Sequence, residues 1–122
     1  MHEKELFLND WQGADSNALT EQFELERGAL DDIEILLASY ARDAYCGEAF
    51  ILFRQGSRLY EVNASHNSSD GIEGQWEPEE TLIVALRYRM EKGRLGSRQD
   101  EGGLFADELT FLLAELEAEG YQ

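Results

Sequence analysis

The amino-acid sequence predicts an α+β fold: a single small domain in which an antiparallel hairpin or a three-stranded sheet is covered by about four helices. Three observations predict this class. A length of 122 residues is the usual size of one domain. Aromatic and β-branched residues on both sides of a short glycine-containing segment in mid-chain are typical of a hairpin. Apolar residues recur at helical spacing before and after that hairpin.

A first helix is expected over residues 16–27. Residues 1–15 show no clear period, although their apolar side chains can dock onto a core. Leu19 and Phe23 then follow at helical spacing, and Gly28 is a natural helix end because glycine accepts the left-handed conformation.

A second helix is predicted over residues 31–44. One set of apolar positions has helical spacing: Ile33, Leu36, Leu37 and Tyr40. Ile33, Ile35 and Leu37 also fit an alternating strand. The abundance of Leu, Ala, Glu and Arg in this stretch favours the helix.

The clearest element is the hairpin. Residues 49–54 and 59–63 are rich in aromatic and β-branched residues, and residues 55–58 form a short loop containing Gly56. Two strands alone are marginally stable in water. We therefore expect a third strand, either from the N-terminal third of the chain or from an intermolecular partner.

Two further helices are predicted after a polar loop. Pro78 suits the first turn of a helix over 78–92, which Gly93 ends. Its apolar stripe consists of Leu82, Ile83, Leu86 and Met90. Residues 93–103 are expected to form a mobile loop, and a last helix follows over 103–119. Its apolar face consists of Phe105, Leu109, Leu112, Leu113 and Leu116.

The net charge of −16 is concentrated at the two ends of the sequence. Residues 1–34 hold 10 acidic and 2 basic residues (−8), and residues 100–122 hold 7 acidic residues and no basic one (−7). Residues 35–76 carry 5 acidic and 3 basic residues (−2), and residues 77–99 carry 4 and 5 (+1). Acids at the end of the last helix oppose its dipole, which is locally unfavourable. This pattern has two interpretations: the acidic residues serve solubility, or they form a surface that imitates a phosphate backbone.

The charge argues against direct binding to nucleic acid or to an anionic membrane, because phosphates are repelled. The basic segment 87–98 could bind RNA, but pairing with the acidic ends is favoured. No apolar stretch is long enough for a transmembrane helix, and the first 20 residues lack the pattern of a signal peptide. A single Cys46 suits a reducing compartment. We expect the protein in the cytoplasm of a bacterial host.

Few residues are suited to catalysis or metal binding. His66 is the candidate acid–base residue, with Asp70 and Glu73 nearby in sequence and Cys46 as a nucleophile or a small buried thiol. No motif supports their pairing. Two His and one Cys are too few for a zinc site, and neither a calcium loop nor a phosphate-binding loop is present. The sequence therefore predicts no enzyme activity, no metal and no cofactor.

Three segments, 47–53, 59–66 and 73–81, resemble a family of small acidic phage and prophage proteins without assigned function. The shared pattern is G-x-A-F-x-L-F, then L-Y-E-V-N-x-S-H, then G-Q-W-E-P-E-E-T. Members carry cysteines just after the histidine, where this chain has Asn67 and then two serines. The resemblance covers about a third of the chain and implies a mobile-element context, and any metal or thiol role in the family lacks its residues here.

These observations favour a non-enzymatic, phage-type inhibitor of a host defence complex, such as a CRISPR or restriction complex. Its acidic surfaces would mimic nucleic acid and occupy a basic groove of a nucleic-acid-binding partner. The candidate binding residues are Asp31, Asp32, Glu34, Asp100, Glu101, Asp107, Glu108, Glu115, Glu117 and Glu119. One alternative is an accessory homodimer of a phage or bacterium whose acidity serves only solubility. Another is a small enzyme that uses His66.

Overall fold

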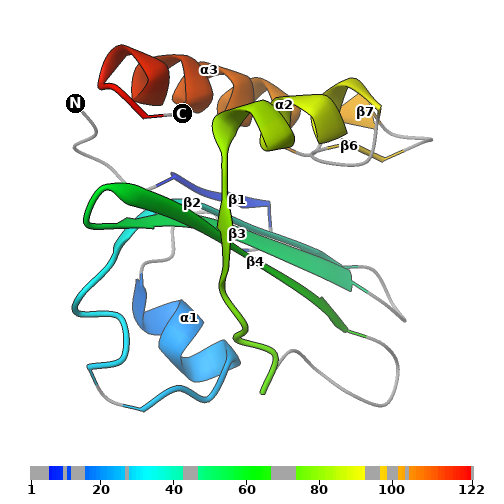
Figure 1. The fold of residues 1–122 in the computed structure, drawn as a ribbon. Coiled ribbons are helices and arrows are strands. Elements are labelled where there is room, and N and C mark those ends of the chain that lie inside the picture. Colours follow the sequence, from blue (N-terminus) through cyan, green and yellow to red (C-terminus); the bar gives the residue numbers. More distant parts are fainter. Residues whose placement is uncertain are drawn as a thin grey trace. The chain divides into compact units, whose positions relative to one another are not determined.

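Five strands form one mixed sheet in the order β1-β2-β3-β4-β5 (Figure 1). The computed structural model describes residues 6–9, 11, 16–26, 28–42, 47–66, 74–92, 97–98, 102–103 and 105–121. The chain divides into two compact units, which we call the N-terminal unit (His2–Glu80) and the C-terminal unit (Thr81–Gln122). The single domain expected from the chain length stays a prediction.

The predicted α+β fold, a hairpin or three-stranded sheet under about four helices, is wrong. The described chain is mostly sheet, and its helices are short. They are α1 (Ser16–Gln22), α2 (Ile83–Glu91) and α3 (Ala106–Ala118). The main error is the helix predicted over 31–44, which the structure replaces with a strand.

That strand, β2 (Glu34–Arg42), lies inside the sheet between β1 (Leu6–Asn9) and β3 (Gly47–Gln55). Residues 35–40 are all buried, so both faces of β2 are covered. A strand buried on both faces has a continuous apolar run in place of alternation. A bulge between Ile35 and Leu37 shifts the register further. These two features gave the stretch its apparent helical spacing.

The segments β1, α1 and β2 form a crossover unit. β1 pairs with β2 in parallel, which requires the chain to return to the same end of the sheet. Helix α1 provides that return and packs on one face of the sheet (Figure 1). The expected third strand therefore comes from the N-terminal third of the chain.

The predicted hairpin is confirmed. β3 pairs antiparallel with β4 (Arg58–His66), and the turn between them is Gly56–Ser57. Gly56 has a φ of 65°, as the first central position of a II′ turn requires. Strands β2 and β3 also pair antiparallel, and the two outer strands β1 and β5 (Glu79–Thr81) are short.

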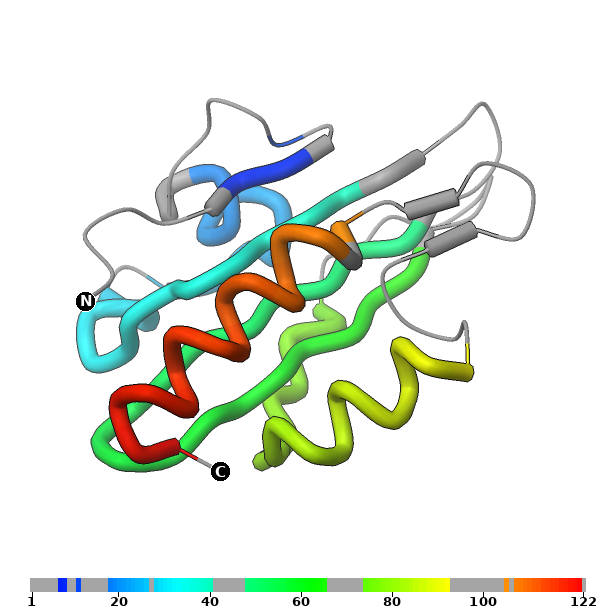
Figure 2. The backbone as a smooth tube through the Cα atoms, turned by 90° about the horizontal axis from the view of Figure 1, so that it is seen from above, coloured from blue at the N-terminus to red at the C-terminus, as the bar shows by residue number. Residues whose placement is uncertain are grey.

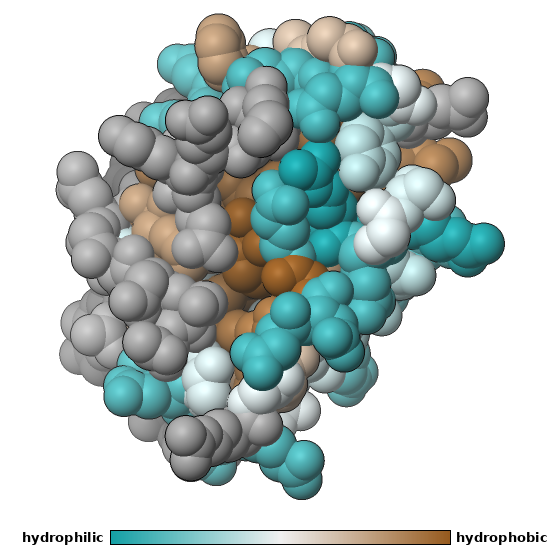
Figure 3. All heavy atoms as spheres, turned by 90° about the vertical axis from the view of Figure 1, so that its left-hand side faces the viewer, coloured by the Kyte–Doolittle hydropathy of each residue, from teal (hydrophilic) through white to brown (hydrophobic). Residues whose placement is uncertain are grey.

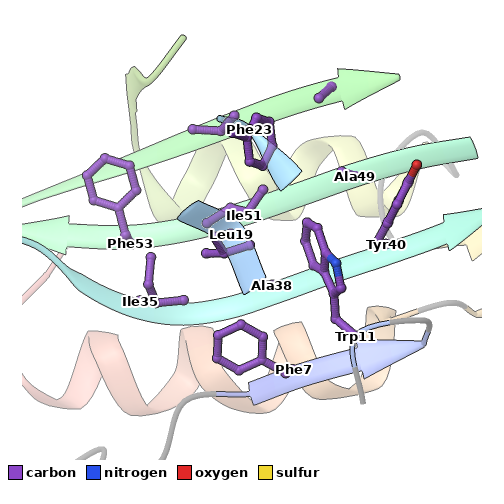
Figure 4. Close-up of a cluster of buried hydrophobic side chains, with 12 residues drawn as sticks. Phe7, Trp11, Leu19, Phe23, Ile35, Ala38, Tyr40, Ala49, Ile51 and Phe53 are labelled. Atoms are coloured by element: carbon purple, nitrogen blue, oxygen red, sulfur yellow. The ribbon is translucent and has the colours of Figure 1, made fainter. Parts of the chain in front are cut away.

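The core of the N-terminal unit lies between α1 and the sheet (Figure 4). Trp11 contacts Tyr40, with ring centroids 5.1 Å apart, so the segment after β1 docks as expected. Trp76 stacks on Phe53 at 5.8 Å and meets Phe23 edge-on at 5.1 Å. The two contacts of Trp76 join the residue just after α1, β3 and the segment before β5.

Helix α2 begins later than predicted. Pro78 precedes β5, which pairs at the edge of the sheet, so the helix starts only at Ile83. Its N-cap, Leu82, has extended backbone and donates or accepts no side-chain capping bond. Of the predicted apolar stripe, Ile83 and Leu86 are buried, whereas Leu82 is half-exposed.

Helix α3 confirms the predicted apolar face, since all five predicted residues are buried. Within the C-terminal unit, α2 and α3 lie side by side (Figure 2). In the sequence between α2 and α3, β6 (Ser97–Arg98) pairs antiparallel with β7 (Gly102–Gly103). The rest of the loop predicted over 93–103 lies outside the described residues, and its mobility stays a prediction.

Candidate binding surfaces

The predicted binding residues fall into two groups, one in each compact unit. In the N-terminal unit, acidic residues gather from the last turn of α1 to the first residue of β2, and we call the described residues 21–26 and 28–34 the acidic connection. Its exposed acidic residues are Glu21, Glu24, Glu26, Asp31, Asp32 and Glu34. The predicted residues Asp31, Asp32 and Glu34 lie at its end, where the chain enters the sheet.

One residue of the acidic connection is held by a basic partner. Arg54 of β3 donates from Nε to Glu34 Oε1 at 3.0 Å and from Nη2 to Glu34 Oε2 at 2.9 Å. The two residues are cross-strand neighbours in the register of β2 and β3. A bidentate pair of this kind fixes the carboxylate. Arg54 therefore positions the carboxylate of Glu34 at the start of β2.

The acidic connection also contains a carboxylate at a position that favours glycine. Glu24 has a φ of 54°, the left-handed region. The Leu25 N–H donates to the Thr20 carbonyl at 2.9 Å, and the Glu24 N–H donates to the Glu21 carbonyl at 3.3 Å. These two bonds define a Schellman motif whose left-handed residue is usually glycine. Helix α1 thus ends at Gln22, and Glu24 takes the left-handed position just beyond it, before the Gly28 that the sequence suggested.

In the C-terminal unit, α3 is an acidic helix. Asp107 and Glu108 are exposed in its first turn, where they complement the helix dipole. Its C-terminal end carries Glu115, Glu117 and Glu119, of which the last two are exposed, and the last turn contains no basic residue. The predicted residues Asp100 and Glu101 lie outside the described residues.

Part of the charge of α3 is compensated within the unit. Arg87 of α2 pairs with Glu117 through Nη2 and Oε1 at 2.6 Å. This contact agrees with the expectation that the basic segment pairs with acidic residues. This ion pair does not involve Asp107 or Glu108, which lie at the other end of α3.

The structure also shows an apolar surface on the C-terminal unit that the sequence did not predict. Its residues are Val84 and Tyr88 of α2 and Phe111 of α3, which are 67%, 56% and 68% exposed. We call these three residues the apolar patch. The available signals were the unbroken apolar run Leu82–Val84 and the position of Phe111 outside the apolar face of the last helix.

No family model, curated protein or solved structure matches this chain. The resemblance to phage proteins therefore stays an expectation from the sequence. Figure 3 shows one side of the molecule, on which hydrophilic residues, in teal, occupy much of the described surface and hydrophobic residues, in brown, also reach it.

Of the residues named for catalysis, the structure describes only the backbone position of one. His66 is the last residue of β4, and Cys46, Asp70 and Glu73 lie outside the described residues. Within the described part of the chain, no three His, Cys, Asp or Glu residues form a group that could hold a metal ion. Among the described helices, none has the length and apolar composition to cross a bilayer.

Proposed function

We propose that this protein is a non-enzymatic inhibitor that binds a basic, nucleic-acid-handling protein or complex. The target class suggested by the phage-like sequence pattern is a host defence complex, such as a CRISPR or restriction complex. The acidic connection and the acidic face of α3 occupy positions at which the target holds phosphates.

The observation that carries this proposal is where the acidic residues sit. Glu115, Glu117 and Glu119 lie at the C-terminal end of α3, where carboxylates oppose the helix dipole. Glu24 occupies a left-handed position that glycine fills at lower cost. A protein that needs acidity only for solubility can place carboxylates at neutral surface positions. Acids at unfavourable positions support a role for their location.

The proposed mechanism is pairing of these carboxylates with Lys and Arg side chains of the target. Arg54 and Glu34 show the geometry within this chain, since a guanidinium binds both oxygens of one carboxylate. An extended acidic surface also steers a basic partner toward the complex and accelerates association. Both effects weaken as salt screens the charges.

The test begins with affinity capture from a host lysate that contains defence systems, followed by mass spectrometry. The captured partner is then purified, and its dissociation constant is measured over a range of salt concentrations. The expected result is a steep loss of affinity with salt. Replacing Asp107 and Glu108 by Asn and Gln should weaken binding and make it less sensitive to salt. A partner whose affinity is the same at low and high salt contradicts the mechanism.

The apolar patch supports a second candidate, an accessory homodimer whose acidity serves only solubility. Val84, Tyr88 and Phe111 are the kind of exposed apolar side chains that mark contact sites. Analytical ultracentrifugation tests this directly. A tight dimer that dissociates when Phe111 is replaced by Ala, with no partner captured from lysate, would favour this function over the inhibitor.

A further inference from the structure

Helices α2 and α3 run antiparallel and present one outer surface. Thr110 Oγ1 of α3 lies 3.9 Å from Met90 Sδ near the end of α2, while Arg87, one turn earlier, pairs with Glu117, two turns later on α3. The earlier residue of α2 contacts the later residue of α3, so the two helices run in opposite directions. The level of any residue on one helix can therefore be assigned on the other.

The apolar patch lies on this outer surface. Val84 and Tyr88 are four residues apart and share one face of α2. Phe111 follows Thr110, so it lies about one helical turn from the level of Tyr88. The buried residues Leu86 and Leu109 occupy other faces of the same two helices. The three residues thus lie on the exposed sides of α2 and α3, apart from the buried residues of both helices.

Acidic residues surround Phe111 on α3. Asp107 and Glu115 lie four residues before and after it, and Glu108 lies three before, so all three flank it on the helix surface. Helix α3 contains no basic residue. An exposed aromatic ring framed by carboxylates is complementary to a partner with apolar side chains between cationic ones.

The Tyr88 side of the patch already has a cation of the same chain beside it. Lys92 Nζ lies 5.4 Å from the centroid of the Tyr88 ring. A Lys or Arg placed over an aromatic face is attracted by the ring quadrupole. A second copy of this protein that packs α3 against α3 is a poor occupant, because it would bring the acids of the two helices together. Helix α2 carries Arg87 and Arg89, with Lys92 at its C-cap, so a cationic occupant is favoured on the α3 side of the patch, around Phe111.

We propose that the apolar patch docks a cationic amphipathic segment of the partner, which inserts apolar side chains around Phe111 and pairs its Lys or Arg residues with the exposed Asp107 and Glu108. This inference rests on the proposed function, and it adds a short-range apolar anchor to the long-range charge. The anchor provides specificity that carboxylates alone lack, since apolar contacts require a matching surface.

The test uses three synthetic probes: a helical peptide of leucine and lysine with the leucines on one face, a scrambled peptide of the same composition, and oligolysine of equal charge. Binding is measured by fluorescence anisotropy with the full chain. The amphipathic peptide should bind most tightly. Replacing Phe111 by Ala should weaken it about tenfold, and Tyr88→Ala should weaken it in the same direction. Oligolysine binding should be unchanged by either substitution.

Leu82→Ala is the matched control, because Leu82 is half-exposed and apolar but precedes α2 and lies off the stripe of Val84 and Tyr88. It should leave peptide binding unchanged. Circular dichroism and the unfolding midpoint check that each variant is folded, and exposed Phe111 should tolerate Ala well. Amide chemical shifts should change on α2 and α3 when the amphipathic peptide is added.

Two outcomes overturn the inference: equal affinity of wild type and Phe111→Ala for the amphipathic peptide, or equal affinity for the amphipathic and scrambled peptides. Neither outcome touches the proposed function, which depends on the salt response of the captured partner. A captured partner whose affinity is independent of salt contradicts the proposed function, even if the peptides bind as expected. The two failures are therefore separate observations.

Discussion

The ends of α1 and α3 form a matched pair that tests how much Glu24 destabilises the fold. Both helices end in a Schellman motif. In α3 the Tyr121 N–H donates to the Leu116 carbonyl at 3.0 Å, and Gly120 takes the left-handed position with a φ of 102°. In α1 the equivalent position is Glu24, with a φ of 54°.

The magnitude follows from the two backbone costs. A left-handed conformation costs a residue with a Cβ about 1–2 kcal/mol. Glycine recovers that amount but gains conformational freedom in the unfolded chain, which costs about 0.4–1 kcal/mol. Glu24→Gly should therefore raise the free energy of unfolding by about 0.5–1 kcal/mol. Gly120→Ala should lower it by about the same amount, and no atom lies within 4 Å of the added Cβ, so the effect is purely conformational.

Urea unfolding followed by tryptophan fluorescence and circular dichroism measures both variants. Glu24→Ala is the control that removes the carboxylate but keeps the Cβ, and it should change stability little. A shift of about 1 kcal/mol corresponds to roughly 3–6 °C in Tm for a chain of this size. A loss of stability in Glu24→Gly, or no loss in Gly120→Ala, would refute the argument that Glu24 is kept at a cost.

Three further experiments test local features. Gln75 pairs with both backbone groups of Ser65, donating from Nε2 to the carbonyl at 2.7 Å and accepting the N–H at Oε1 at 2.9 Å, so Gln75→Ala should cost about 1 kcal/mol. Faster hydrogen exchange of the Ser65 amide reports that loss, and unchanged exchange would contradict it. Leu82→Asp supplies a capping side chain at an extended N-cap and should stabilise by about 0.5–1 kcal/mol, measured by urea unfolding. A double-mutant cycle on Glu34 and Arg54 should give a coupling of about 0.5–1 kcal/mol that falls with added salt, whereas a coupling independent of salt argues against an ion pair.

The sequence predicted the elements whose pattern is local. The hairpin has a clean alternation and a glycine turn, and α3 has one apolar stripe on a polar helix, so both were identified with their core residues. The strand β2 could not be identified in this way, because burial on both faces removes the alternation that distinguishes a strand from a helix. Its environment comes from β1 and β3, which are distant in sequence.

The candidate surfaces also combine features that follow from the local sequence with features that depend on packing. Exposure of the acidic residues follows from their charge, and the described members of the predicted set are exposed except Glu115, which is half-buried. The pairing of Glu34 with Arg54 depends on the register of two strands and is invisible in the sequence. The exposure of Phe111 depends on which face of α3 is buried, and this is a property of packing.

The most direct test of the account is competition between this protein and nucleic acid for the captured partner. The partner is saturated with labelled protein, and the nucleic acid that the partner binds is added in increasing amounts. Nucleic acid should displace the protein, and the protein in turn should release bound nucleic acid. A ternary complex in which the partner holds both at once would contradict the proposal that these carboxylates occupy a phosphate-binding groove.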